Sequence, residues 1–488
     1  MRGSVTSRMR LVIPTAHAPS AGACMHAPEP GPHAVLAFPS AFFQACGSAL
    51  LQARGTAIYP QHVSDIVVMK FGGTSVADAA RIRRAARRIV DRRDSGSRVL
   101  AVLSARGSTT DELIGMAAEV SDTPDPREMD MLLSTGERIS CALCAMAIHD
   151  LGHHAISLTG SQAGIVTDSS HTRARIIDVR AERIMSALDE DRIVLVAGFQ
   201  GVSTDSSDVT TLGRGGSDTT AVALAAAVGA EVCEIYTDVP GVFSADPRIV
   251  ADARRLDVVS FEEMLEMAAS GAGVLQLRSV EYARNHGVRI HCRSSFEDRP
   301  GTVVVSEGEN MDRSEKPLIT AVAHSTSEAM ITLLGVRHRP GVAASIFEAL
   351  AGAGVDVDMI DQNVPASAGG LAEISFTVPR EHLREARAAL EPLARETYSE
   401  LIAYEDMGKV SVVGAGMRSH PGVAAQVFSV LAGQGLNIEM ISTSPIRISC
   451  VIPREHVDSV VQALHSAFEL SGPDTIVAEQ TFAARGTP

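Results

Sequence analysis

Lys70-Phe-Gly-Gly-Thr-Ser-Val76 follows the short apolar run Ile66-Val-Val-Met69, and Thr211-Leu-Gly-Arg-Gly-Gly-Ser-Asp-Thr219 lies later in the chain. A strand that ends in a lysine and two glycines can turn backbone N–H groups towards an anion, with a positive charge beside them and no Cβ in the way. Together the two stretches predict a phosphate-binding site. Neither is a Walker A loop, and G-x-G-x-x-G is absent after the first strand, so P-loop and dinucleotide-binding predictions lose their main support.

The size and charge of the chain restrict the classes of function. At 488 residues the chain is too long for one ordinary core, so we expect about two to four domains. A formal net charge of −15 disfavours nucleic-acid and anionic-membrane partners, which need clustered positive surface. Apolar runs such as Thr219 to Val228 are much shorter than the roughly 20 residues of a membrane-spanning helix. These features favour small-molecule chemistry, with no nucleic-acid and no membrane partner.

The seven cysteines are scattered, and most lie in apolar segments, as reduced cytosolic cysteines usually do. We therefore expect no disulfide framework. Cys141 and Cys144 form a C-x-x-C, but they lie in a helix-like apolar run without a second cysteine pair nearby. This setting favours buried thiols over a redox or zinc site, and we predict no metal-ligand set.

Residues 1–62 differ in composition from the rest of the chain. They are rich in Ala, Pro, Gly and His and contain one acidic residue, Glu29. Such a composition does not build a core, although a basic, acid-poor start is also typical of an organellar transit peptide. We favour a disordered extension or a mis-assigned upstream start, because the first regular strand pattern begins near Ser64.

Short apolar runs alternate with longer amphipathic ones over residues 64–306. This β-α-β order predicts an α/β fold with a largely parallel sheet. The loops that face phosphate then lie at the carboxyl ends of strands, where open α/β sheets bind ligands. We predict strands over Ile66 to Met69, Val99 to Leu103, Ile193 to Ala197 and Val232 to Tyr236, and helices over Ala77 to Val90 and Asp218 to Val228.

After about Lys316 two shorter units repeat each other at an offset of 81 residues: Pro340-Gly-Val-Ala-Ala344 recurs as Pro421-Gly-Val-Ala-Ala425. Each unit is predicted to contain a strand, a Pro-Gly turn, a helix and another strand. A helix that opens directly after the Pro-Gly, such as Val342 to Leu350, has free N–H groups that form a seat for a carboxylate. The alternative is a plain Pro-Gly turn that binds nothing.

The motifs of the chain, in their order, match a known family. They are Lys70 to Val76, Ser134-Thr-Gly-Glu137, Gly198-Phe-Gln-Gly201, Thr211 to Asp218, Tyr236-Thr-Asp238, Gly241-Val-Phe-Ser-Ala-Asp-Pro-Arg248 and the two repeats. The set resembles the monofunctional aspartate kinases (aspartokinases) of the amino acid kinase family over about residues 64 to 480. The resemblance implies a three-layer α/β/α catalytic domain over 64–306 and two ferredoxin-like (βαββαβ) ACT regulatory domains over 317–400 and 408–480.

The resemblance also implies an activity. The family transfers the ATP γ-phosphoryl group to the side-chain carboxylate of L-aspartate, giving 4-phospho-L-aspartate, with ATP and Mg²⁺ as cofactors. This is the first step towards lysine, threonine, methionine and diaminopimelate, so we expect a cytoplasmic biosynthetic enzyme. Phosphoryl transfer depends mostly on positioning and charge stabilisation, for which Lys70 is suited. The attacking carboxylate is already ionised at neutral pH, so no strong general base is needed.

The family's site residues carry over to matching positions of this sequence. Glu137 would pair with the substrate ammonium, and Arg214 would bind its α-carboxylate through a fork-to-fork contact. Asp218 would organise the substrate and Lys70, and these two residues are the predicted catalytic pair. A solvated helix residue for Glu137 and a plain N-cap for Asp218 are the structural alternatives. The other predicted substrate contacts are Gly215, Gly216, Ser217 and Thr110, with Thr109 an equal match to the last.

The nucleotide and effector sites are also implied by the resemblance. ACT units pair, often between chains, and bind amino acids, so we expect a homo-oligomer with lysine or threonine, or both, as effectors. The predicted nucleotide contacts are Lys70, Phe71, Gly72, Gly73, Ser104, Thr237, Asp238, Phe243, Asp246 and Arg248. The predicted effector contacts are Pro340, Gly341, Val342, Asp356, Met359, Ile360, Gln362, Asn437 and Ile438.

Some features leave the regulation open. Asp361 replaces a usual apolar residue and Pro445 a usual glutamate, which affects effector identity. Met311 precedes the repeats and marks a candidate internal start, which would give an α2β2 assembly. Rival predictions are another amino-acid or carbamate kinase, an inactive amino-acid sensor and a homoserine dehydrogenase fusion. The paired repeats disfavour another kinase of this fold. An inactive sensor is disfavoured because the chain keeps Lys70, Glu137, Arg214 and Asp218. A dehydrogenase fusion is disfavoured because no dinucleotide fingerprint is present.

Overall fold

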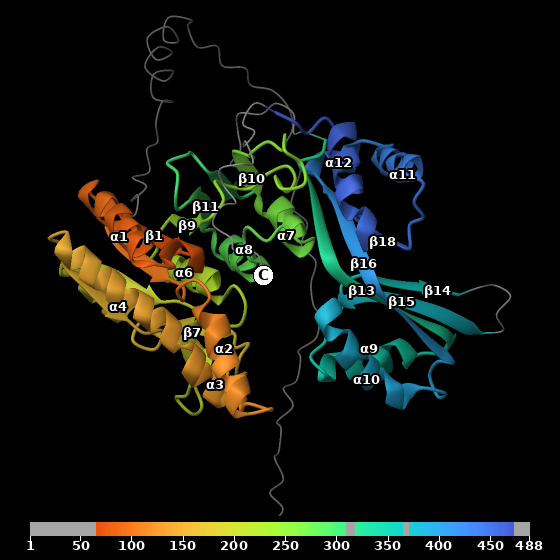
Figure 1. Cartoon of the computed structure of the whole chain (residues 1–488), viewed down its shortest axis with the longest axis horizontal. Helices are drawn as coiled ribbons and strands as arrows, with labels where there is room; N and C mark the ends of the chain where they lie inside the picture. The colour runs from red at the N-terminus through yellow and green to blue at the C-terminus, as the bar shows by residue number, and fades with distance from the viewer. Residues whose placement is uncertain (1–64, 309–317, 365–369, 473–488) are drawn as a thin grey trace, which may run out of the picture. The chain divides into compact units, whose positions relative to one another are not determined.

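Eight strands form the central sheet of the α/β domain, in the order β10-β12-β11-β9-β1-β2-β6-β3 (Figure 1). The computed structural model describes residues 65–308, 318–364 and 370–472. All neighbouring strands are parallel except β11 and β12, so the prediction of a largely parallel sheet is confirmed. The strands are β1 (Ile66–Phe71), β2 (Arg98–Leu103), β3 (Ala155–Leu158), β6 (Ile193–Ala197), β9 (Val232–Thr237), β10 (Val258–Ser260), β11 (Arg289–Ser294) and β12 (Thr302–Val305).

Helices cover both faces of this sheet. Successive strand residues point to opposite faces, so Val67 and Met69 of β1 join one core, with α1 and α4, while Ile66 and Val68 join the other. Burial on both faces explains why the strands appear as continuous apolar runs, and the predicted three layers are confirmed. The helices of the layers are α1 (Ala79–Asp94) and α4 (Thr135–Asp150) on one face, and α5 (Glu182–Asp189), α6 (Gly216–Ala227), α7 (Phe261–Ala269) and α8 (Leu277–His286) on the other.

The carboxyl ends of the central strands lie in register. Phe71, the last residue of β1, pairs with Leu103 at the end of β2 and with Tyr236 near the end of β9. Leu103 pairs in turn with Ala197, the last residue of β6. Backbone segments that follow these strands therefore meet at one edge, which is where the predicted phosphate-facing loops lie.

A second, four-stranded sheet has the strand order β5-β4-β7-β8. Its strands are β4 (Ile165–Thr167), β5 (Ile176–Val179), β7 (Gln200–Ser203) and β8 (Val209–Thr211), and the helices α2 (Thr109–Val120) and α3 (Pro126–Leu133) precede it. Within the described residues, Pro126–Asp150 alone is long and apolar enough to cross a membrane, and half of it is buried inside the protein. That stretch comprises α3 and α4, which join at Ser134, and it covers the α/β core.

The two repeats share one antiparallel sheet, β14-β15-β13-β16-β18-β17 (Figure 1). The Pro-Gly turns precede helices as predicted: α9 begins at Val342 and α11 at Val423, each after a glycine with positive φ. The strands are β13 (Ala321–Arg337), β14 (Ile360–Asn363), β15 (Leu371–Pro379), β16 (Glu400–Val413), β17 (Met440–Ser444) and β18 (Arg447–Pro453), and the helices are α9 (Val342–Gly352), α10 (Leu383–Leu390), α11 (Val423–Gly433) and α12 (Val457–Ala467).

The repeats are interleaved, because both of them use strand β13. Strand β13 is long enough to serve both units: its first part, residues 321–325, pairs with residues 409–413 of β16 next to β18, and its later part pairs with β15. Ile319 and Val322 accordingly lie in the core of the second unit, while Ile331 and Leu333 lie in that of the first. The sequence repeat did not indicate that β13 serves both units, because this strand precedes both copies of the Pro-Gly motif.

A loop of the α/β domain completes the core of the second repeat. Phe243, Ala245 and Val250 are buried in the same apolar cluster as residues of β16, α11 and α12. The backbone N–H of Val322 donates to the carbonyl of Ser244 over 2.8 Å, and the Ser244 hydroxyl lies 2.9 Å from His465 Nε2. The α/β domain and the second repeat therefore share one core.

The cysteines of the described segments are free and buried, as predicted. Burial raises the pKa of Cys144 to about 12 and also raises that of Cys141, so neither thiol is reactive at neutral pH. Residues 1–62 and Met311 lie outside the described residues.

The shared core leads to a stability prediction. Leu470 is buried in this cluster, so Leu470→Ala should lower the free energy of unfolding by about 2–5 kcal/mol, and the α/β domain and second repeat should unfold in one transition. Denaturant unfolding followed by circular dichroism measures both quantities. Ile360→Ala, at an exposed strand residue, is the control and should change stability little. A separate early transition in the Leu470 variant would contradict the shared core.

Candidate active site

A buried ion pair lies at the centre of the candidate site. The Lys70 ammonium, near the end of β1, contacts Asp218 Oδ1 in the first turn of α6, and the two side chains are 11% and 8% exposed. A lysine is rarely buried without an anionic partner, and the helix N-terminus favours a carboxylate at this place. The tight turn needs Gly215, whose φ is 72° and whose Cβ would overlap the Gln276 side chain. The structure thus brings together the two residues predicted as catalytic.

Glu137 is a buried carboxylate with incomplete hydrogen bonding. It lies in the first turn of α4, where Oε1 accepts a hydrogen bond from the Ala105 backbone N–H over 3.1 Å. Its other oxygen, Oε2, is buried and has no hydrogen-bond partner within the described residues. Burial raises the pKa of Glu137 to about 7. A group this expensive to bury is well suited to receive a cation from a ligand.

Arg214 differs from these two residues because it is exposed. It lies in the loop between β8 and α6, and its guanidinium forms no hydrogen bond or ion pair with other described residues. The loop itself is held in place: the Leu212 N–H donates to the Phe199 carbonyl over 2.8 Å, and Arg278 donates to the Leu212 carbonyl over 2.7 Å. An unpaired fork of donors on a fixed loop can bind a carboxylate with two hydrogen bonds.

The phosphate-facing turn after β1 is only partly as expected. The Gly72 N–H, predicted to face an anion, instead donates to the Tyr236 carbonyl over 3.2 Å. A Cβ at Gly73 would lie 2.9 Å from the Ala105 carbonyl, so close packing requires this glycine. The Phe71 side chain is buried and stacks on Tyr236 with ring centroids 4.8 Å apart, so any nucleotide contact at residue 71 is through its backbone.

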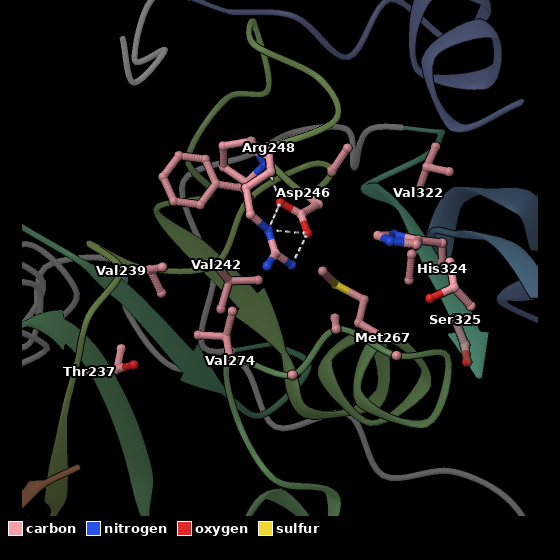
Figure 2. A pocket seen from close by; sticks show the side chains of 18 of the residues that line it. Thr237, Val239, Val242, Asp246, Arg248, Met267, Val274, Val322, His324 and Ser325 are labelled. Atoms are coloured by element: carbon pink, nitrogen blue, oxygen red, sulfur yellow. Dashed lines mark hydrogen bonds and ion pairs between the residues drawn. The ribbon is translucent and has the colours of Figure 1, made fainter. Parts of the chain in front are cut away.

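A cavity of about 410 Å³ opens beside the end of β9 (Figure 2). Five of the predicted nucleotide residues line it: Thr237, Asp238, Phe243, Asp246 and Arg248. Arg248 Nε lies 3.0 Å from both carboxylate oxygens of Asp246. Burial acts to raise the pKa of Asp246, but the contacts with Arg248 outweigh it and hold that pKa below its usual value. Ser104, which follows β2, does not line this cavity.

The opposite wall of the cavity was not predicted. It comes from the first part of β13, where His324, Ser325 and Thr326 line the space facing Arg248 (Figure 2). Burial lowers the pKa of His324, so the imidazole is neutral at pH 7. No signal in the sequence could have found these residues, because β13 lies outside every motif and meets the cavity only through the interleaved sheet.

A second unpredicted group lies beneath the Arg214 loop. Asp130 of α3 is fully buried, and its carboxylate accepts hydrogen bonds from the Thr211 hydroxyl and from the Thr172 N–H. His171 Nδ1 lies 2.7 Å from its Oδ2. Thr211 belongs to the quoted motif, but a lone aspartate in an amphipathic helix gave no sign of this contact. Thr109 and Thr110 open α2 and are both half-buried, so the structure does not choose between them.

The predicted effector residues separate into two groups. Pro340, Gly341, Val342 and Gln362 line a cavity of about 330 Å³ at the start of α9. Met359 does not reach a surface, because it is buried with Met330, Met407 and Met440. The remaining positions lie outside this cavity: Asp356, Ile360 and Asn437 are exposed, and Ile438 packs partly against the core of the second repeat.

Comparison with known proteins identifies similar sequences over most of the chain. The amino acid kinase family model matches residues 65–294, and the ACT domain model matches residues 331–392 and 410–468. The aspartokinase of Mycobacterium tuberculosis is 57% identical over 410 residues, which cover 84% of this chain and 97% of that protein. The aspartokinase of Corynebacterium glutamicum is 52% identical over 413 residues, covering 84% and 98%.

Solved structures are similar too. Aspartokinase III of E. coli in complex with aspartate and ADP, in its R-state, matches with a TM-score of 0.71 and 27% identity, covering 82% of this chain and 99% of that one. The same enzyme in complex with lysine and aspartate, in its T-state, matches with a TM-score of 0.64 and 28% identity, covering 83% and 100%.

The buried Glu137 carboxylate leads to a pH prediction. Its pKa is raised from 4.5 to about 7, so its contribution to stability is complete below pH 4.5 and is lost as pH rises through 7. Glu137→Gln keeps an acceptor for the Ala105 N–H but cannot ionise. At pH 8 this variant should therefore be more stable than the unchanged protein, by an amount on the order of 3 kcal/mol that disappears near pH 5.

Denaturant unfolding at the two pH values measures this difference. The matched control is Glu128→Gln, at an exposed glutamate of the neighbouring helix α3, which should change stability by about 1 kcal/mol or less. Equal stability of Glu137→Gln and the unchanged protein at pH 8 would contradict the raised pKa.

Proposed function

Since the chain belongs to the aspartokinase family, as an ATP-dependent aspartate kinase with ACT domains, we propose that Lys70, Glu137, Arg214 and Asp218 form its reaction centre. The observation that carries this proposal is the presence, at one edge of the sheet, of a buried Lys70–Asp218 pair and of a buried carboxylate, Glu137, with one unpaired oxygen.

L-Aspartate binding uses two groups of opposite charge. Glu137 Oε2 receives the substrate ammonium, which completes the hydrogen bonding of a buried carboxylate. Arg214 binds the α-carboxylate through its planar fork of donors. With both ends of the amino acid held, the side-chain carboxylate is presented as the nucleophile. Its pKa lies well below 7, so the protein needs no base to activate it.

Phosphoryl transfer then forms one bond and breaks one. A side-chain carboxylate oxygen of L-aspartate attacks the γ-phosphorus of ATP, the bond from that phosphorus to the bridging oxygen breaks, and ADP leaves with the electron pair. Lys70 stabilises the negative charge that spreads over the transferred group. Asp218 holds the Lys70 ammonium in place, because a buried lysine without a partner would lose its proton or move.

ATP is proposed to bind along the cavity at the end of β9, with Thr237, Asp238, Phe243, Asp246 and Arg248 as contacts. Within the described residues no group of three or more His, Cys, Asp or Glu side chains forms a metal site. Mg²⁺ of the kind used by kinases keeps several waters and binds mainly to substrate phosphates, with one or two carboxylates. Asp238, which lines the cavity, would supply such a carboxylate.

The regulatory proposal rests on the ACT units. Lysine is bound by aspartokinase III of E. coli in one of its structures. We infer that an amino acid of the lysine or threonine branch binds near α9 in a homo-oligomer, and that the enzyme serves lysine, threonine, methionine and diaminopimelate synthesis in the cytoplasm. The α2β2 assembly remains an alternative for the oligomer.

The first experiment is an activity assay of the purified chain. The protein is given Mg-ATP and L-aspartate, and the acyl phosphate is trapped with hydroxylamine. The assay is run under four conditions: without effector, with lysine, with threonine, and with both. We expect hydroxamate formation with aspartate but not with glutamate, lowered by at least one effector. A folded protein that binds an amino acid yet makes no hydroxamate would support the inactive-sensor alternative instead.

Arg214→Lys tests the substrate assignment. Lysine keeps the charge but loses the bidentate contact, so KM for L-aspartate should rise by about tenfold or more while KM for ATP changes little. Arg248→Lys, on the nucleotide side, is the matched control and should raise KM for ATP instead. Equal changes in both KM values for Arg214→Lys would contradict its assignment to the substrate carboxylate.

A further inference from the structure

We propose that Asp130 is a positioning residue for L-aspartate, fixing the separation between Glu137 and Arg214. This inference rests on the proposed roles of those two residues. Asp130 itself is fully buried inside the protein and is separate from the Lys70–Asp218 pair. Its importance lies in the elements that its carboxylate joins.

The two proposed anchors of the amino acid lie on different elements. Glu137 is in the first turn of α4, which follows α3 directly through Ser134. Arg214 lies in the loop after β8, a strand of the small sheet. The ammonium and α-carboxylate of an amino acid have a fixed separation, so a site that binds both needs these two elements to keep a fixed distance.

Asp130 provides that link by side-chain hydrogen bonds. Its Oδ1 accepts from the hydroxyl of Thr211, the last residue of β8 and three residues before Arg214. Hydrogen bonds to a buried carboxylate are among the stronger ones, since the acceptor is charged and water is excluded. The Asp130–Thr211 contact therefore holds α3 rigidly against the base of the Arg214 loop.

The other donors brace the same loop from the side. Both Asp130 oxygens lie 3.1 Å from the Thr172 nitrogen, and His171 Nδ1 lies 2.7 Å from Oδ2. Thr172 has a φ of 67°, a left-handed conformation that threonine rarely adopts, and its carbonyl lies 3.1 Å from where a Cβ of Gly213 would be. The Asp130 carboxylate thus holds, through the Thr172 N–H, a turn of unfavourable backbone conformation that packs against the loop of Arg214.

A neighbouring hydrogen bond links the same two parts of the protein, the β7–β8 hairpin and the α3–α4 joint. Gln200 is the cross-strand partner of Thr211, and its Nε2 donates to the Ser134 carbonyl over 2.8 Å. The β7–β8 hairpin is therefore fastened at two adjacent points to the joint between α3 and α4. Glu137 lies three residues after Ser134, so the Asp130 and Gln200 contacts together set the spacing between α4 and the base of the Arg214 loop.

Three variants on one strand test the proposal. Thr211→Val removes the hydroxyl that reaches Asp130 while keeping the shape, Thr211→Ser retains the hydroxyl, and Thr210→Val removes an equally buried hydroxyl that instead pairs with Thr167 over 2.6 Å. Steady-state kinetics give kcat and both KM values, and thermal unfolding gives Tm.

We expect Thr211→Val to raise KM for L-aspartate by about tenfold, with KM for ATP and kcat within about twofold. Thr211→Ser should restore KM for aspartate to within about twofold of the unchanged enzyme. Thr210→Val should lower Tm as much as Thr211→Val does, with KM for aspartate unchanged.

Equal increases of both KM values in Thr211→Val, or the same rise in KM for aspartate in Thr210→Val, would show a general structural role and overturn the proposal. An unchanged KM for aspartate in Thr211→Val would overturn it as well. Failure of the proposed function is a separate result: it would appear as no aspartyl hydroxamate from the unchanged enzyme, whatever the Thr211 variants do.

Discussion

The buried ion pair between Lys70 and Asp218 is the contact on which the rest of the site depends. A lysine ammonium inside a sheet edge needs an anion beside it, and an aspartate in the first turn of α6 provides one where the helix dipole favours it. That requirement fixes α6 against β1. Because α6 begins directly after the Arg214 loop, and β1 ends next to β2 and β9, the pair also fixes that loop relative to the ends of these strands.

Two of the other charged groups lack protein partners for part or all of their hydrogen bonding, and for the buried one, Glu137, this costs stability. Glu137 is buried with one oxygen unpaired, and burial raises its pKa to about 7, while Arg214 extends from its loop without a partner among the described residues. Active sites commonly keep such groups, because a ligand of opposite charge supplies the missing partner. Asp130 shows the opposite arrangement: it is more deeply buried, and Thr211, Thr172 and His171 of the protein itself supply its partners.

The nucleotide cavity is shared between the catalytic and regulatory parts of the chain. Its loop, through Phe243 and Ala245, is packed into the core of the second ACT unit, and its far wall is the first part of β13. Lys409 extends this connection: its ammonium lies 3.6 Å from Glu328 and 3.2 Å from the Ala269 carbonyl at the end of α7. Packed side chains and backbone hydrogen bonds therefore connect the regulatory sheet directly to the wall of this cavity.

The sequence by itself determined the elements and much of the site. Continuous apolar runs predicted strands buried on both faces, and β6 was placed at its observed bounds, Ile193–Ala197. The Pro-Gly repeat predicted α9 and α11, and the motif residues Lys70 and Asp218 indeed meet. Only the tertiary structure decided the rest: the sharing of β13 between the ACT units, the hydrogen bond from the Gly72 N–H to Tyr236, the burial of Met359, and the positions of Asp130 and His324. The physical reason is that local periodicity and turn chemistry are encoded within a few residues, whereas pairing partners distant in sequence are chosen by the packing of the whole chain.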